Sequence, residues 1–165
     1  MITNNDETHL VCLVIGSNLS PGENLPKSVS MLRRYVDIKL LSMVWESPDV
    51  GGKRANYLNA AILIETNLFA SNFKKQVLRS IEAALGRLRT DKKGCPCAID
   101  LDILIFDGII INCNLWRFAF LAVPIAEIYP NIENPLTNET LKDAALRLSQ
   151  QTEILLRPDV RLLSQ

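Results

Sequence analysis

The chain has 165 residues, of which 48% are hydrophobic, and this length and apolar content predict one compact domain over residues 1–165. Its 18 Lys and Arg residues balance 18 Asp and Glu residues, so the formal net charge is zero. The composition excludes a disordered chain. It also argues against binding of nucleic acid or of an anionic membrane surface, because both partners require clustered positive charge.

No apolar run approaches the roughly 18 residues of a membrane-spanning helix, and the first residues lack the positive head of a signal peptide. We therefore expect a soluble, cytoplasmic protein. The single histidine, His9, is expected in an N-terminal tail, which argues against a hydrolase triad. No CxxC pair is present, so a zinc site is not expected and reduced thiols are predicted at Cys12, Cys95, Cys97 and Cys113.

The first predicted element is a strand over residues 10–15, a short β-rich apolar run that ends at the turn sequence of residues 16–18. A helix should follow. Asn24 is expected to cap it, and Pro26 is tolerated because it would lie in the first turn. The apolar stripe of this helix is Leu25, Val29, Leu32 and Val36.

A second strand is expected over residues 38–46, and the Gly- and Pro-containing segment 47–56 predicts a mobile loop of the kind that often carries function. Residues 57–66 predict a third strand. A long helix is then expected to begin at Ser71. Its predicted core residues, at helical spacing, are Phe73, Val77, Ile81, Leu85 and Leu88.

Residues 98–106 predict a fourth strand, which the hairpin dipeptide Asp107-Gly108 turns back into residues 109–111. The resulting order, βαββαβ, is typical of an α/β (α+β) ferredoxin-like fold. In that fold a mainly antiparallel sheet carries its two helices on one face.

The hairpin and one more helix are expected as C-terminal additions to this core. Thr137 or Asn138 would cap the added helix, and Leu141, Ala145 and Leu148 would form its buried side. The tail over residues 153–165 shows no clear partner in the sequence.

Asp100 and Asp102 stand two residues apart in the fourth predicted strand, so they share one face of the sheet. Two carboxylates about 6–7 Å apart repel each other unless a cation lies between them, and Mg²⁺ is the natural candidate. The alternative is a solvated sheet face. That alternative is weakened because the same face continues into Leu104 and Phe106.

A basic cluster precedes this acidic pair and consists of Arg87, Arg89, Lys92 and Lys93. Cations near the end of a helix are commonly no more than partners of the helix dipole. Close to two metal-binding aspartates, however, they would also form a clamp for a polyphosphate. The sequence contains neither a P-loop nor a protein-kinase signature, so nucleotide chemistry would require another fold.

Taken together, these segments resemble the 6-hydroxymethyl-7,8-dihydropterin pyrophosphokinase family, and the resemblance covers most of the chain. The order and spacing of several short motifs carry it, and each motif alone is weak. They are residues 16–19 (GSNL), 57–61 (YLNAA), Glu82 with 86–89 (GRLR), Pro96 with 99–104 (IDLDIL), Phe120-Leu121, Pro124, Glu127-Ile128 and Pro130.

The resemblance implies an enzyme that transfers pyrophosphate from MgATP to the hydroxymethyl group of a reduced pterin, a step of folate biosynthesis that releases AMP. It implies two Mg²⁺ ions on Asp100 and Asp102, with Arg87 completing the catalytic set. Loops 47–56 and 90–97 would be mobile lids. The implied nucleotide contacts are Glu82, Arg87, Arg89 and Lys93, and the implied pterin contacts are Ser47, Pro48, Val50, Tyr57, Asn59 and Phe120.

Three departures from the family pattern concern the nucleotide. Cys97 stands where the family has an arginine, the family's PHP segment is missing, and Phe118 occupies another arginine position with Arg117 beside it. Two alternatives to an active enzyme therefore stay open: a diverged homologue that binds pterin or nucleotide with little turnover, and a ferredoxin-like regulatory module. The resemblance implies small-molecule substrates, a reduced pterin and ATP, and no protein partner can be predicted from the sequence.

Overall fold

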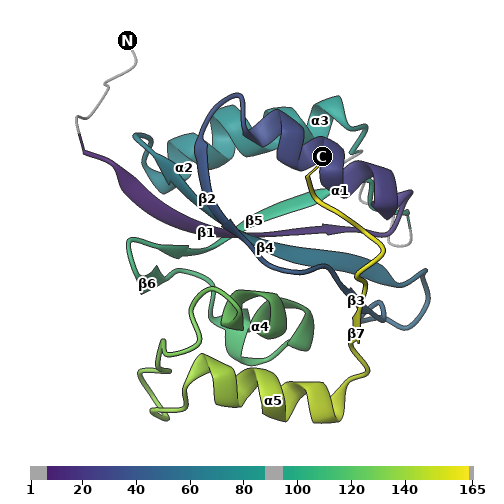
Figure 1. Ribbon diagram of the computed structural model, residues 1–165, viewed down its shortest axis with the longest axis vertical. Helices are drawn as coiled ribbons and strands as arrows, with labels where there is room; N and C mark the ends of the chain where they lie inside the picture. The colour runs from purple at the N-terminus through teal and green to yellow at the C-terminus, as the bar shows by residue number, and fades with distance from the viewer. Residues whose placement is uncertain (1–6, 88–94, 164–165) are drawn as a thin grey trace.

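A seven-stranded sheet separates two layers of helices in the computed structural model, which describes residues 7–87 and 95–163 (Figure 1). All recorded strand pairs are antiparallel, in the order β6-β5-β1-β4-β3-β7, with β2 also pairing with β4. The strands are β1 (His9–Ser17), β2 (Asp37–Leu41), β3 (Trp45–Ser47), β4 (Tyr57–Thr66), β5 (Asp100–Phe106), β6 (Ile109–Ile110) and β7 (Leu155–Leu156).

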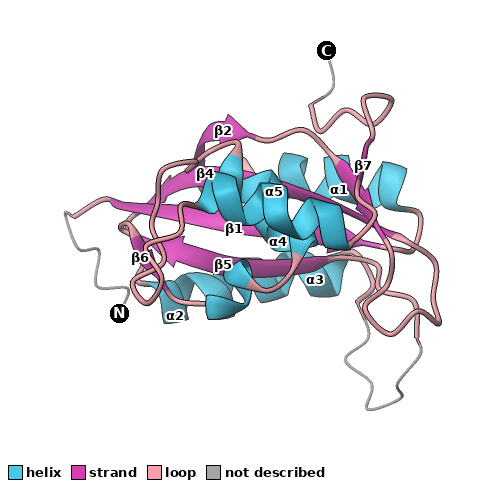
Figure 2. Ribbon diagram, turned by 90° about the horizontal axis from the view of Figure 1, so that it is seen from below, coloured by secondary structure: helices cyan, strands magenta, loops and turns pink. Residues whose placement is uncertain are grey.

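The helices divide between the two faces of the sheet (Figure 2). The segments α1, α2 and α3 cover one face, whereas α4 and α5 cover the other. None of the helices within residues 7–87 and 95–163 is long and apolar enough to cross a bilayer. The bounds are α1 (Pro21–Leu32), α2 (Ala70–Phe73), a π turn (Lys74–Leu78), α3 (Arg79–Ala84), a 3₁₀ turn (Cys113–Trp116), α4 (Ala119–Ala126) and α5 (Leu141–Gln151).

The predicted ferredoxin-like core is confirmed, because β5, β1, β4 and the β2/β3 segment lie in the order of that fold. Strand β1 occupies its centre, between β4 and β5. Successive side chains of a strand point to opposite faces, so β1 supplies both apolar layers. Val11, Leu13 and Ile15 belong to the core under α1–α3, whereas Cys12 and Val14 belong to the core under α4 and α5.

Helix α1 begins earlier than predicted, at Pro21 in place of a cap at Asn24. A proline at the first helical position is favourable because its fixed φ suits the helix and its missing N–H has no partner there. Asn24 lies inside the helix, and its Nδ2 donates to the Leu19 carbonyl (2.7 Å). Pro26 is therefore interior, and Val36 lies beyond the helix end.

The second predicted strand is interrupted, and β2 and β3 replace the single run over residues 38–46. Ser42 lies in the gap. Its backbone N–H donates to the Ala61 carbonyl (2.9 Å), and its hydroxyl oxygen accepts from the Ala61 N–H (2.8 Å). The Ser42 hydroxyl thus replaces a backbone carbonyl as the acceptor for the Ala61 N–H. The chain can bend between β2 and β3 while this N–H of β4 keeps a hydrogen bond.

The long helix begins at Ala70, one residue before the predicted start, and includes the π turn between α2 and α3. This turn inserts one extra residue into the helical repeat, so that Val77 and Leu78 are both buried. Phe73 and Ile81 are buried and Leu85 is partly buried, as predicted, whereas Leu88 lies outside the described residues.

The hairpin at Asp107-Gly108 is confirmed, with φ values of 48° and 78° that suit a type I′ turn. His9 begins β1, in contrast to the expected tail position, and its Nδ1 lies 2.7 Å from the Asp107 carboxylate. Leu10 N–H also donates to Asp107 (2.8 Å). The hairpin tip therefore anchors the start of the central strand.

Helix α4 has no counterpart among the predicted elements. It is apolar around most of its circumference because it lies between the sheet and α5, so it shows no amphipathic period. At its end, the Glu127 carboxylate accepts from Met43 N–H (2.9 Å) and from the Trp45 ring N–H (2.5 Å), which fixes α4 to the gap between β2 and β3. Helix α5 is confirmed, but its cap is Thr140, whose Oγ1 accepts from Asp143 N–H (3.2 Å).

The C-terminal segment, for which the sequence shows no clear partner, pairs with β3 and packs on the core. Strand β7 pairs with β3, and the Arg157 guanidinium forms an ion pair with Glu46. Leu162 is 7% exposed and belongs to the core under α1–α3.

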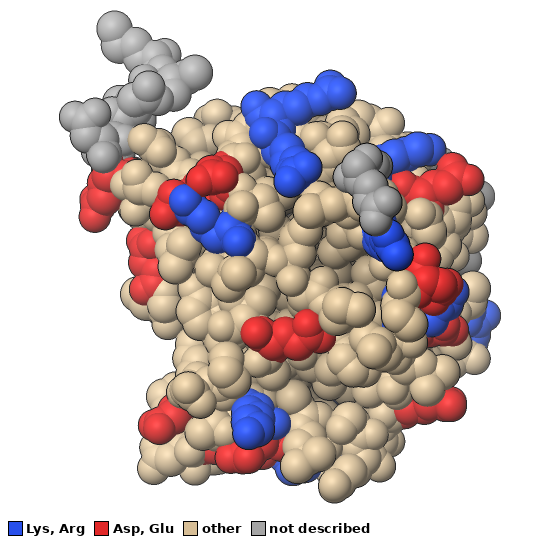
Figure 3. Space-filling model, in the orientation of Figure 1, with Lys and Arg blue, Asp and Glu red and all other residues tan. Residues whose placement is uncertain are grey.

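Charged side chains of both signs are interspersed over the face seen in Figure 3, where no large single-sign patch is visible.

Candidate active site

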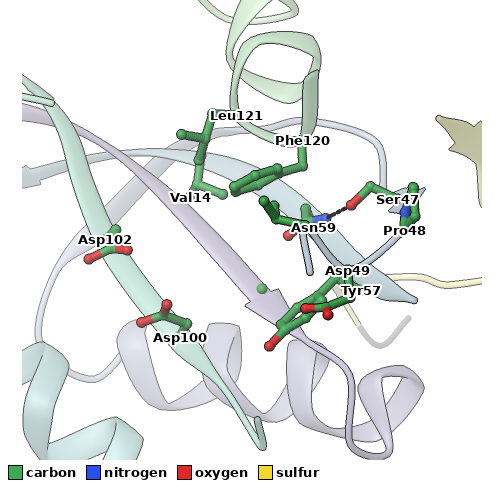
Figure 4. Close-up of a pocket in the computed structure, with 12 residues that line it drawn as sticks. Val14, Ser47, Pro48, Asp49, Tyr57, Asn59, Asp100, Asp102, Phe120 and Leu121 are labelled. Atoms are coloured by element: carbon green, nitrogen blue, oxygen red, sulfur yellow. Dashed lines mark hydrogen bonds between the residues drawn. The ribbon is translucent and has the colours of Figure 1, made fainter. Parts of the chain in front are cut away.

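A cavity of about 220 Å³ opens where β1, β4 and β5 meet the loop after β3 and the start of α4 (Figure 4). The strands supply polar and acidic side chains, whereas α4 and the loop supply apolar ones. The lining residues are Val14, Gly16, Ser47, Pro48, Asp49, Val50, Tyr57, Asn59, Asp100, Asp102, Phe120 and Leu121.

The polar wall of the cavity is built on Asn59 in β4. Its Nδ2 donates to the Ser47 hydroxyl (3.0 Å), and the two side chains are each 3% exposed as residues. Gly16 of β1 lies directly opposite Asn59 in the register, and a Cβ there would lie 2.8 Å from Asn59 Oδ1. The absence of a side chain at Gly16 therefore leaves room for the Asn59 amide to face the cavity.

Aromatic side chains border the same pocket. Phe120 extends from α4 over Val14 and Asn59, and Tyr57 lies at the opposite end of the cavity (Figure 4). Burial raises the pKa of the Tyr57 hydroxyl above its ordinary value, so the hydroxyl is protonated at neutral pH. The Phe118 ring lies 5.4 Å from that of Phe120, and the exposed Arg117 guanidinium lies over Phe118 (5.8 Å) and outside the cavity wall.

The acidic wall consists of Asp100 and Asp102, whose carboxylates project from one face of β5 toward the cavity (Figure 4). Each has a cation beside it: Arg87 forms an ion pair with Asp100, and the Lys74 ammonium lies 3.5 Å from Asp102. The predicted common face is thus confirmed. Neighbouring cations offset part of the repulsion between the two carboxylates.

Glu82 holds Arg87 in place from behind the acidic wall. Its carboxylate is buried, accepts from the Leu101 N–H of β5 (3.0 Å) and forms an ion pair with Arg87. Although burial by itself lowers the pKa of Arg87, the charges of Asp100 and Glu82 raise it above its usual value. The guanidinium is therefore a fixed positive charge at the first aspartate.

The donor set of the acidic wall fits Mg²⁺. Burial and the charge of Asp100 together raise the pKa of Asp102, so this carboxylate gains from a nearby divalent cation. Among residues 7–87 and 95–163 no three Asp, Glu, His or Cys side chains cluster as metal ligands. Two hard carboxylates with solvent access match the Mg²⁺ pattern, in which water and substrate phosphates complete the shell.

The first motif, residues 16–19, acts as a clasp on the segment before β5. The Asn18 and Leu19 N–H groups both donate to the Cys97 carbonyl (3.1 Å each), and Cys97 N–H donates to Asn18 Oδ1 (2.6 Å). The Ser17 hydroxyl also donates to that carbonyl (3.3 Å). Burial and the nearby Asp100 raise the pKa of the Cys97 thiol, so it is neutral and supplies no charge.

All six residues expected to contact pterin line one cavity with Asp100 and Asp102. Glu82 and Arg87 lie behind this wall, and Arg89, Lys92 and Lys93 fall outside the described residues. Period-two alternation along β1 is a signal that could have included Val14 and Gly16. Lys74 could not be placed from sequence, because its position depends on the π turn. The expected site residues did not include these lining or adjacent residues: Val14, Gly16, Asp49, Lys74 and Leu121.

Comparison with known families gives a match to the family model described as 7,8-dihydro-6-hydroxymethylpterin-pyrophosphokinase (HPPK), over residues 12–130. The chain belongs to the HPPK family. The matched range includes every described residue of the cavity and its supporting clasp. The resemblance seen in the motifs is thereby confirmed.

Relatives of this HPPK-family chain include the 2-amino-4-hydroxy-6-hydroxymethyldihydropteridine pyrophosphokinases of Aquifex aeolicus (28% identical, 81% of this chain and 88% of the relative) and Bacillus subtilis (28%, 87% and 92%). The folic acid synthesis protein FOL1 of Dictyostelium discoideum is 29% identical over 87% of this chain. The chain spans only 23% of that longer relative.

Solved structures confirm the HPPK fold. A crystal structure of a Plasmodium falciparum HPPK-DHPS triple mutant aligns with a TM-score of 0.69 over 90% of this chain and 46% of that one, at 10% identity. The likeness at this identity concerns the arrangement of helices and strands. It supports the ferredoxin-like core with its added C-terminal helices.

Proposed function

We propose that this chain transfers the pyrophosphoryl group of ATP to 6-hydroxymethyl-7,8-dihydropterin, giving the pterin diphosphate and AMP in folate biosynthesis. One observation carries the proposal: a single cavity joins a polar and aromatic pocket to a pair of carboxylates backed by cations. A transfer between a flat heterocycle and a polyphosphate requires these two halves side by side. A cytoplasmic location remains a prediction from the sequence.

The pocket half suits the pterin ring. Phe120 offers an aromatic face for stacking, and the buried Asn59 amide offers a donor and an acceptor to the polar edge of the heterocycle. Ser47 holds that amide in a fixed orientation through its hydroxyl. Pro48 and Val50 of the loop, with Tyr57, close the remaining sides.

The acidic half suits the metal-bound nucleotide. Asp100 and Asp102 would hold two Mg²⁺ ions, which neutralise phosphate charge when bound. Arg87 stands beside Asp100 as an additional positive charge for the polyphosphate, oriented by Glu82. Arg89 and Lys93, which fall outside the described residues, are proposed as further nucleotide contacts.

In the proposed reaction the pterin hydroxyl oxygen forms a bond to the β-phosphorus of ATP. The bond from that phosphorus to the α,β-bridging oxygen breaks, AMP leaves with the oxygen, and the hydroxyl proton passes to bulk water. The side chains described here contribute by placing the two substrates in line and by excluding competing water. Phe120 and Leu121 cover the apolar side of the reaction site.

The direct test is incubation of the chain with MgATP and 6-hydroxymethyl-7,8-dihydropterin, with detection of AMP. We expect stoichiometric AMP and pterin diphosphate. Pterin binding without AMP would instead favour a diverged homologue, which the uncharged Cys97 and Phe118 at two of the family's arginine positions would then explain. The proposal would be overturned if no product formed and neither substrate bound.

The pocket assignment is tested with Asn59→Ala and Phe120→Ala, using titration of a pterin analogue. An unpaired buried polar partner costs about 1–3 kcal/mol, so Asn59→Ala should weaken binding about tenfold or more. Asn72→Ala is the matched control, since Asn72 is exposed on α2 across the sheet. If both pocket variants bind the analogue with the affinity of the unaltered protein, the pterin does not bind in this pocket.

The acidic wall is tested with Asp100→Ala and Asp102→Ala. We expect each variant to lose Mg²⁺-dependent ATP binding and to remain folded, because removal of one carboxylate relieves repulsion in the pair. Calorimetric titration with and without Mg²⁺ measures the loss. Parent-like MgATP affinity in both variants would remove the metal assignment.

A further inference from the structure

Lys74 is a cation of the acidic wall that no motif in the sequence includes. Its ammonium lies 3.5 Å from Asp102 Oδ1, and both side chains retain solvent access, with 44% and 43% exposed. The residue comes from the helical layer on the far side of β5, and the π turn lies against that strand. It therefore reaches the cavity edge from the side opposite the loop that lines the pocket.

The π turn accounts for this placement. Lys74 is its first residue and directly follows Phe73, which is fully buried. Because Val77 and Leu78 are then both buried, the turn is held tightly against the sheet. π turns are rare and occur frequently at functional sites, where they redirect a side chain without ending the helix.

The two cations found at the acidic wall among residues 7–87 and 95–163 differ in how they are held. Arg87 is fixed from two sides, by Asp100 and by the buried Glu82. Lys74 has one ion-pair partner among the described residues, Asp102, and its four-carbon side chain is flexible. If Asp102 takes up a metal ion, Lys74 is released, whereas Arg87 keeps an anchor in Glu82.

We propose that Lys74 is a further phosphate-binding residue, whose ammonium balances Asp102 in the ligand-free protein and moves to the polyphosphate when Mg²⁺ occupies the aspartates. This inference rests on the proposed function of the site. It adds a cation at the Asp102 end of the wall, whereas Cys97 lies near Asp100 and Arg87 and supplies no charge. An ammonium is a compact point charge that can follow a phosphate oxygen over a short distance.

The proposal requires effects of opposite sign on two ligands. Lys74 competes with Mg²⁺ for Asp102 when the metal binds alone, so its removal should strengthen binding of Mg²⁺ alone. The same ammonium attracts the polyphosphate when metal and nucleotide bind together, so its removal should weaken that binding. A merely structural residue would move both affinities in the same direction.

The test is calorimetric titration of Lys74→Gln with MgCl₂ alone and with the Mg²⁺ complex of α,β-methylene-ATP, which cannot release AMP. We expect affinity for Mg²⁺ alone to rise about two- to fivefold and affinity for the nucleotide complex to fall about five- to tenfold, as suits one partly exposed charge. Lys74→Arg should retain parent-like nucleotide affinity. Lys75→Gln is the matched control, because Lys75 is the exposed neighbour on the same turn.

Loss of both affinities, no change in either, or a change in Mg²⁺ binding alone would each overturn the proposal. Thermal unfolding establishes that each variant is folded, and Lys74→Met provides a second neutral variant if the glutamine form unfolds. The proposed function is judged separately, from AMP formation by the unaltered chain. An active parent with parent-like Lys74→Gln titrations would refute only the role of Lys74.

Discussion

Asp102 is a carboxylate whose surroundings oppose its charge. Burial and the neighbouring Asp100 raise its pKa, while Lys74 offsets only part of this effect. The Asp102 carboxylate therefore binds a proton more tightly in the folded protein than in the unfolded chain. Stability from this group is present below the ordinary pKa and is lost as pH rises through the folded pKa.

We accordingly expect Asp102→Asn to raise the free energy of unfolding at pH 7 without Mg²⁺ and to have little effect near pH 3. The gain should be under about 1 kcal/mol, because the side chain is partly exposed and its charge is screened. Urea unfolding in EDTA at both pH values measures it, with Asp37→Asn in exposed β2 as the control. Equal or lower stability at pH 7 would contradict the prediction. Added Mg²⁺ should stabilise the parent and leave the variant unchanged.

Cys97 is a neutral residue at a place where charge would be useful. The clasp of residues 16–19 fixes its backbone, and its thiol is close enough to Asp100 for that charge to raise its pKa. A cation built onto this fixed backbone would meet the polyphosphate beside Arg87. A cation at position 97 should therefore raise kcat with little effect on the affinity for the pterin.

We expect Cys97→Arg to raise kcat well over tenfold, since one preorganised charge commonly contributes on the order of 10²–10³. Steady-state kinetics and pterin titration of both proteins provide the measurement, and pterin affinity should not change. Cys113→Arg is the control, because Cys113 is exposed in the 3₁₀ turn. If the unaltered protein already turns over rapidly and Cys97→Arg leaves kcat unchanged, other cations already supply the charge.

The pairing of β1 with β4 sets the width of the pocket. Their register places Gly16 opposite Asn59, so the side chain that faces the pterin pocket depends on a missing side chain in the neighbouring strand. This dependence belongs to the strand pair, because neither strand alone creates the close approach.

Gly16→Ala should therefore reduce pterin affinity about tenfold or more and destabilise the fold by about 1–3 kcal/mol, because the new methyl group displaces a buried amide from its partner Ser47. Analogue titration and urea unfolding measure the two effects. Gly22→Ala in α1 is the matched control, with open space around its Cβ, and should be neutral or slightly stabilising. An alanine variant at position 16 with parent-like affinity would show that the amide does not contact the ligand.

The two apolar cores share the same central strands. The core under α1–α3 and the core under α4 and α5 meet at β1 and β4, whose alternate residues belong to each. Strain or loss of packing on one face is therefore transmitted to the other through the backbone of the sheet. The molecule should unfold as one cooperative unit.

We expect Leu78→Ala and Leu148→Ala, one in each core, to lower the free energy of the same single transition by about 2–5 kcal/mol each. Urea unfolding followed by circular dichroism and by tryptophan fluorescence should give coincident curves. Leu146→Ala, on the exposed side of α5, should cost less than about 0.5 kcal/mol. Two separate transitions would show that the helical layers fold independently.

Local patterns were sufficient for the parts of the fold whose signal is local. Strands β1 and β4 each contain a continuous apolar run, and the Asp107-Gly108 turn has its own φ preference. The positions of these elements could therefore be predicted from the sequence. The aspartates could be placed on one face because strand geometry alternates with period two. The pterin-facing residues came from resemblance to a family, which encodes long-range contacts indirectly.

Contacts between distant segments decided the remainder. Glu127 bonds to the backbone in the gap between β2 and β3, and the clasp joins residues 16–19 to Cys97. Strand β7 pairs with β3, although most of the chain separates the two strands in the sequence. Lys74, the first residue of the π turn, lies 3.5 Å from Asp102 on a separate strand. These features have no local signature, since each is stabilised by partners that sequence spacing alone does not bring together. The sequence by itself therefore determined β1, β4 and β5 and the chemistry of the acidic pair. Tertiary packing decided which cations and which backbone groups surround that pair.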